Sequence, residues 1–181
     1  VEHIQIPAQK GWADLMSEKI KFVTSSNQQP KLIFPGAFNP MHDGHIAMSE
    51  LANKELSEEV FFEICIQNVD KPPLSYHQIK KTIDQFTDSK NWVLTKAGKF
   101  SDKAKLFPNS TFIIGADTLV RIFDERFYAS RREMMEEFEI FNTNNNNFLV
   151  FGREYKNKFI ELDDIQAVSY THLRAHETPI N

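Results

Sequence analysis

The sequence contains a single cysteine, carries little net charge and has no long apolar run. Because Cys65 stands alone, no disulfide bond can form within the chain, and in its apolar surroundings the thiol is most simply a small hydrophobic side chain. The net charge of −4 argues against a general nucleic-acid-binding protein, which would carry a basic face. No stretch reaches the length of a membrane span, and no signal peptide pattern opens the chain. We therefore expect neither nucleic acid nor membrane as a partner, and a cytoplasmic location.

The remaining composition is that of an ordinary globular domain. The chain has 181 residues, of which 41% are hydrophobic and 25% charged, enough for one domain with a substantial core. We expect this domain to span residues 30–166. Residues 1–29 open on Val1 and run into the linker-like SSNQQP of residues 25–30. They are expected to be either a linker or tail of a fused upstream domain, or an amphipathic helix over 12–23 that packs on the sheet.

Residues 31–50, KLIFPGAFNPMHDGHIAMSE, are the most informative stretch. The pattern predicts a strand over 31–34, a turn-rich loop and a helix from about Gly44. A loop that leads from a strand into a helix N-terminus is suited to bind phosphate, because backbone N–H groups converge there and the helix dipole favours an anion. We expect Gly36 to let the backbone approach a ligand closely, and His42 and His45 to face the helix end together.

The spacing in this stretch resembles the nucleotidylyltransferase superfamily, whose signature is G-x-F-x-P-x-H-x-G-H. Every signature position is met here, by Gly36, Phe38, Pro40, His42, Gly44 and His45. The resemblance implies that His42 and His45 contact the phosphates of a nucleoside triphosphate, with Mg²⁺ bridging that triphosphate. It further implies that the nucleotide contacts the surrounding loop, made of Pro35, Gly36, Ala37, Phe38, Asn39 and Gly44.

The order of the elements predicts an α/β fold, a Rossmann-like parallel sheet with helices on both faces and the phosphate loop after the first strand. The expected strands are 31–34, 60–67, 92–95, 111–115 and 148–154, with an edge strand at 159–162. The expected helices are 44–56, 76–86, 99–106, a helix opened by Asp117 and Thr118, and 127–139. On the helix 99–106 we expect Phe100 and Ala104 to pack inward and Lys103 and Lys105 to be solvated.

Two further segments hold candidate site residues. In related mononucleotide adenylyltransferases a proline-flanked lysine follows the second strand near the phosphate of the acceptor, which implies a catalytic role for Lys71. The run IIGAD resembles the adenylyltransferase motif beside the nucleotide ribose, which implies binding roles for Gly115, Asp117 and Thr118. For Arg121 we expect a surface ion pair with Asp124 or Glu125 rather than a phosphate contact, and Arg131 and Arg132 stand on an ordinary charged helix.

Residues 167–181 are expected to be non-native, because VSYTHLRAHET resembles an in-frame translation of a sequencing-library adapter. Its match to a second family signature, at Ser169, Thr171 and Arg174, is then accidental. On this interpretation the phosphate clamp lacks one wall, and the chain itself is weakly active or inactive.

The resemblance implies an enzyme that transfers a nucleoside monophosphate, AMP from ATP, to a small phosphorylated acceptor such as nicotinamide or nicotinate mononucleotide. Pyrophosphate is released. Two alternatives remain open: a cytidylyltransferase that uses CTP, and a non-catalytic nucleotide-binding module that serves a fused domain. Class I aminoacyl-tRNA synthetases share the histidine motif, but the chain has no KMSKS-like run.

Overall fold

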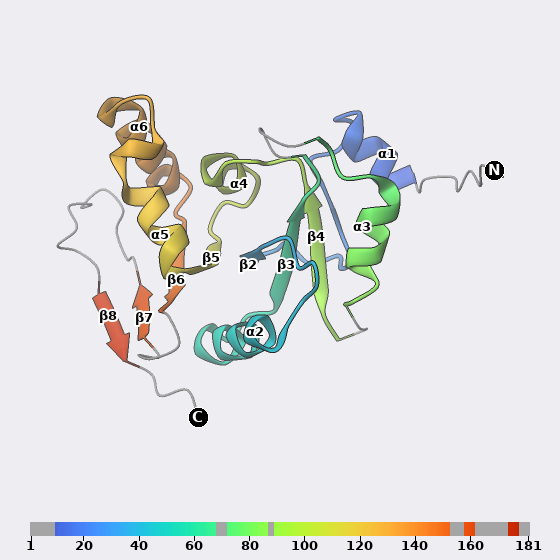
Figure 1. Ribbon diagram of the computed structural model, residues 1–181, viewed down its shortest axis with the longest axis horizontal. Coiled ribbons are helices and arrows are strands. Elements are labelled where there is room, and N and C mark those ends of the chain that lie inside the picture. The colour runs from blue at the N-terminus through green and yellow to red at the C-terminus, as the bar shows by residue number, and fades with distance from the viewer. Residues whose placement is uncertain (1–9, 68–71, 87–88, 153–157, 162–173, 178–181) are drawn as a thin grey trace.

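A computed structural model describes residues 10–67, 72–86, 89–152, 158–161 and 174–177 (Figure 1). In these described ranges, eight strands form one sheet in the order β1-β4-β3-β2-β5-β6-β7-β8. Neighbours from β4 to β6 run parallel, and β1, β7 and β8 add antiparallel edges. The strands are β1 (Phe22–Thr24), β2 (Leu32–Pro35), β3 (Val60–Cys65), β4 (Asn91–Thr95), β5 (Thr111–Gly115), β6 (Asn147–Phe151), β7 (Lys158–Glu161) and β8 (Arg174–Glu177).

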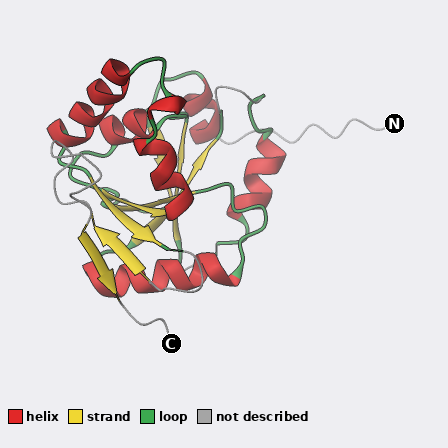
Figure 2. Ribbon diagram, turned by 60° about the vertical axis from the view of Figure 1, so that its left-hand side comes forward, coloured by secondary structure: helices red, strands yellow, loops and turns green. Residues whose placement is uncertain are grey.

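The six α-helices in the part of the chain that the structure describes cover both faces of this sheet (Figure 2). They are α1 (Lys10–Met16), α2 (Asp43–Leu56), α3 (Tyr76–Ile83), α4 (Phe100–Leu106), α5 (Ala116–Phe123) and α6 (Arg131–Thr143), with a 3₁₀ turn at Glu125–Phe127. Alternate residues of each central strand enter two separate cores. Ile33 and Phe61 pack with α4, α5 and α6, whereas Leu32 and Phe62 pack with α1, α2 and α3. This burial on both faces explains why the strands are continuous apolar runs.

The predicted α/β fold with a parallel sheet and helices on both faces is confirmed. β2 lies between β3 and β5 and pairs with both in parallel, with Leu32 opposite Val60 and Thr111. From β2 the chain first adds β3 and β4 on one side of β2, and later adds β5 and β6 on its other side. The point between β2 and β5 is therefore the topological switch point, where ligands bind in open α/β sheets.

Two element predictions are wrong. The amphipathic stretch 12–23 is a helix only to Met16, since Phe22–Thr24 is an edge strand paired with β4. Residues 127–139 do not form one helix, because the Ser130 side chain accepts from the Glu133 N–H and starts α6 at Arg131. Residues 10–24 pack on the sheet, with Leu15 almost fully buried. The division of the chain at residues 29 and 166 stays a prediction.

Within the described ranges, no helix is both long and apolar enough to cross a membrane.

Candidate active site

The two signature histidines form the N-terminus of α2 together. His42 is the N-cap, and its Nδ1 accepts the His45 N–H at 3.3 Å while His45 Nδ1 accepts the His42 N–H at 3.1 Å. Their rings stack with centroids 3.5 Å apart and an interplanar angle of 19°. Both imidazoles thus lie on one side of the helix end, as the sequence predicts. Because each Nδ1 is an acceptor, each neutral ring carries its proton on Nε2, and these two N–H groups remain as donors for a ligand.

Electrostatics keep His45 in this neutral form. Burial lowers the pKa of His45 below its usual value of 6.5, and the neighbouring His42 lowers it further. A neutral imidazole retains the Nδ1 lone pair that caps the helix. The capping geometry and the pKa direction therefore support the same protonation state.

The Phe38 ring packs in the core against His45, one of the paired histidines. The ring of Phe38 is 2% exposed, and the ring centroids of Phe34, Phe62 and His45 lie 5.3, 5.2 and 5.1 Å from it. The apolar ring is buried in the core beneath the loop, so a nucleotide contact at Phe38, which stays a prediction, would be made by its backbone.

The signature glycines make room for these side chains. A Cβ on Gly36 would lie 2.8 Å from Cζ of Phe38, so the absence of a side chain at Gly36 admits the buried ring. The predicted close approach of a ligand at Gly36 stays a prediction. A Cβ on Gly44 would lie 3.0 Å from Cε1 and Nδ1 of the His42 imidazole. Gly115 differs from both, because its missing Cβ faces open space.

Gln85 holds the loop in place, a role that the sequence did not reveal. Its Nε2 donates to the Phe38 carbonyl at 2.6 Å, and its Oε1 accepts the Met41 N–H at 2.8 Å. The amide therefore bridges the residues on either side of the cis Asn39–Pro40 peptide. Nothing in the local pattern marks a glutamine just beyond α3 as the partner of a loop more than forty residues away.

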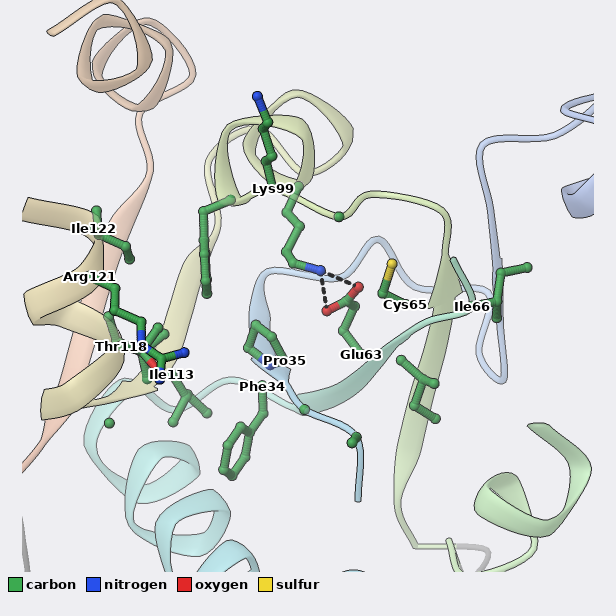
Figure 3. Close-up of a pocket in the computed structure, with 18 of the residues that line it drawn as sticks. Phe34, Pro35, Glu63, Cys65, Ile66, Lys99, Ile113, Thr118, Arg121 and Ile122 are labelled. Atoms are coloured by element: carbon green, nitrogen blue, oxygen red, sulfur yellow. Dashed lines mark hydrogen bonds and ion pairs between the residues drawn. The ribbon is translucent and has the colours of Figure 1, made fainter. Parts of the chain in front are cut away.

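A cavity of about 1060 Å³ opens at the carboxyl ends of the central strands (Figure 3). Six predicted site residues line it, namely Pro35, Gly36, Ala37, Asn39, Gly115 and Thr118. The cavity lining does not include four other predicted site residues, His42, Gly44, His45 and Asp117. His45 is linked to the cavity through Phe34, a lining residue whose ring centroid is 5.9 Å from that of His45. Asp117 is exposed in the first turn of α5, and Lys71 lies outside the described residues.

Arg121 faces the cavity, contrary to the predicted surface ion pair (Figure 3). Asp124 pairs instead with Arg126, at 2.6 Å, because Asp124 is the N-cap of the 3₁₀ turn that contains Arg126. The hydrogen bonds from Arg126 hold the pKa of the Asp124 carboxyl below its usual value. Arg121 thereby adds a cation to the wall formed by α5.

The far wall carries carboxylates and a tyrosine. Burial, with help from Glu137 and Glu133, raises the pKa of Tyr128 to about 12, and its hydroxyl donates to the Ile122 carbonyl at 2.7 Å. Burial also raises the pKa of Glu137, although Lys99 lies 3.8 Å away and opposes the shift. This wall therefore carries a tyrosine hydroxyl and carboxylates beside the Lys99 ammonium.

Lys103 is buried, so its predicted place on a solvated helix face is wrong. Its ammonium pairs with Glu63 at 2.8 Å on the floor of the cavity. Phe100, Lys103, Ala104 and Phe107 are spaced as one helix face, and Glu63 is a lone charge within an apolar strand. These two signals together could have indicated the pair. Cys65 also lines the cavity, and burial raises the pKa of its thiol, which stays protonated.

The described residues contain no cluster of three or more His, Cys, Asp or Glu side chains that could hold a metal ion.

A family model described as cytidylyltransferase-like matches residues 33–175. The matched range begins inside β2 and includes the phosphate loop, both histidines and the cavity walls. No curated protein matches the chain.

Proposed function

The chain belongs to the cytidylyltransferase-like family, a family of nucleotidyltransferases, and from this premise we propose that it transfers AMP from ATP to a small phosphorylated acceptor. Nicotinamide mononucleotide and nicotinate mononucleotide are the acceptors we favour. An oxygen of the acceptor phosphate attacks the α-phosphorus and forms a new P–O–P bond. The bond from the α-phosphorus to the oxygen shared with the β-phosphorus breaks, and pyrophosphate leaves with that oxygen.

The pair of imidazoles at the start of α2 is the observation that carries this proposal. The reaction needs no nucleophile from the protein, only alignment and donors where negative charge grows. The Nε2–H groups of His42 and His45 are two such donors, already oriented by the reciprocal bonds to Nδ1. Donors that are fixed in advance stabilise developing charge without reorganisation.

The cavity supports the same proposal by its place and size. It adjoins the histidine loop, and its volume of about 1060 Å³ lies at the upper end of the range for ligand pockets, which suits a nucleotide and an acceptor together. Lys81, Lys99 and Arg121 on its walls are suited to phosphate oxygens. Bound Mg²⁺ would neutralise charge on the triphosphate, while the loop amides and the imidazoles of this chain orient it.

Pyrophosphate release tests the proposal. We expect release from ATP in the presence of nicotinamide mononucleotide, and a large decrease in the His42→Ala variant. His77→Ala is the matched control, because His77 is exposed on α3 and does not line the cavity. Faster release from CTP than from ATP would assign the chain to the cytidylyltransferases instead.

Calorimetric titration with ATP separates the enzyme from a binding module. Binding of ATP without pyrophosphate release from any acceptor would identify a non-catalytic nucleotide-binding module. If neither ATP nor CTP binds, the proposed nucleotidyl transfer is refuted, because the paired histidines then bind no triphosphate.

A further inference from the structure

A buried ion pair lies on the floor of the cavity, between β3 and α4 (Figure 3). The side chains of Lys103 and Glu63 are only 6% and 1% exposed. Removing two charges from water costs several kcal/mol per ion unless close partners offset it. The phosphate contacts proposed above do not use this pair, so its place among the cavity-lining residues needs a separate explanation.

Almost every hydrogen-bonding position of the Lys103–Glu63 pair is used, and the one that remains is an acceptor. Lys103 Nζ lies 2.8 and 2.9 Å from the two carboxylate oxygens of Glu63 and 2.7 Å from the Ala97 carbonyl, which engages all three of its protons. Glu63 Oε1 also accepts the Thr95 hydroxyl at 2.6 Å. Within the described part of the chain, Oε2 accepts only from Lys103. The floor therefore has no spare donor on its cation and one spare acceptor position on its carboxylate.

The pair also sits beside the phosphate loop. Glu63 is opposite Pro35 in the parallel pairing of β2 and β3, and its carbonyl accepts the Gly36 N–H at 3.1 Å. Adjacent strands are about 4.8 Å apart. A ligand group over Glu63 would thus lie one strand away from the loop proposed to hold the triphosphate, on the side of the switch point away from β5.

We infer that Glu63 and Lys103 form the floor of the acceptor subsite and select an acceptor that presents an uncharged hydrogen-bond donor there, such as a carboxamide. The N–H of a carboxamide can bond to Glu63 Oε2. A carboxylate in the same position finds no free donor, and to gain one it must take Lys103 from Glu63 and leave a buried carboxylate unpaired. This inference rests on the proposed transfer to a pyridine mononucleotide.

Nicotinamide mononucleotide and nicotinate mononucleotide provide the test, because they differ only in carboxamide against carboxylate. With the full chain and ATP, we expect kcat/KM for pyrophosphate release to favour the amide by about tenfold or more, as sites do when the wrong substrate leaves buried polar groups unpaired. In Glu63→Gln the side chain keeps its shape and loses its charge, so the preference should shrink to about threefold or less.

Two further variants make the result interpretable. Lys99→Met removes an exposed cation from the same cavity, and we expect it to lower kcat/KM for both acceptors equally. If Glu63→Gln does not fold, Glu63→Gln combined with Lys103→Met provides an uncharged pair of similar shape, and its preference should shrink in the same way. Thermal unfolding identifies the folded variants.

Equal use of the two acceptors by the wild-type chain, or a preference for the acid, overturns the inference and leaves the proposed transfer intact. Absence of pyrophosphate release with both acceptors refutes the proposed transfer. Calorimetric titration with each mononucleotide then decides the inference by itself. Tighter binding of the amide supports it, whereas equal binding, tighter binding of the acid or no binding of either overturns it.

Discussion

Replacing Gly36 by alanine tests whether the buried ring of Phe38 is what the first signature glycine accommodates. The new methyl carbon would lie 2.8 Å from Cζ of Phe38 and 3.1 Å from both Cε atoms. The ring cannot move aside easily, because it is 2% exposed and also packs against Phe86, with centroids 6.0 Å apart. The backbone at Gly36 imposes no strain of its own, since no described glycine has a positive φ.

The magnitude follows from these contacts. Overpacking a core costs about 1–3 kcal/mol, and we expect the upper part of that range because aromatic rings and His45 surround Phe38. Alanine also lowers the conformational entropy of the unfolded chain, which raises the free energy of unfolding by about 0.4–1 kcal/mol and offsets part of this loss. The net loss of about 1–2 kcal/mol corresponds to a Tm lower by about 2–8 °C for a domain of this size.

Thermal and urea unfolding measure this loss, and Gly11→Ala is the matched control. A Cβ at Gly11 meets Val23 only at 3.5 Å, within a helix that alanine favours, so the Tm should stay level or rise. In a double-mutant cycle, Phe38→Leu should absorb most of the cost of Gly36→Ala, with a coupling of about 1–2 kcal/mol. Strictly additive losses would refute the proposed contact.

Four further outcomes are expected. His45→Ala should lower kcat far more than it weakens ATP binding, because its donor acts where charge develops; equal losses would contradict that role. The lowered pKa of His45 means that its contribution to stability is present above pH 6.5 and is lost as pH falls below that value. The variant His45→Gln keeps a capping acceptor but has no titrating ring. Its Tm should therefore fall less steeply than that of the wild-type chain between pH 7.5 and 5.5. Gly115→Ala should weaken ATP binding, because its methyl group enters open space at the cavity, and unchanged calorimetric affinity would argue against nucleotide there. Arg174→Ala should leave pyrophosphate release unchanged if residues 167–181 are non-native. A large decrease would instead indicate that these residues help to bind the triphosphate.

The sequence by itself determined the elements whose signals are local. Apolar runs bounded by turns defined β2, β3, β4 and β5, and their order predicted a parallel sheet with the loop after its first strand. The spacing from Gly36 to His45 was enough to place both imidazoles at one helix end. In these cases the partners are neighbours along the chain, so a pattern of residues fixes the geometry.

Only the tertiary structure decided which side chains meet across the sheet. Lys103 and Glu63 are forty residues apart. The local pattern marks each as a charge among apolar residues, but only the packing of α4 on β3 makes them partners. The sequence likewise does not show that Gln85 binds the histidine loop. Nor does it show that the Phe38 ring lies in the core against Gly36. The physical reason is common to all of them: the burial of a polar or aromatic side chain depends on partners that the fold alone brings within contact distance.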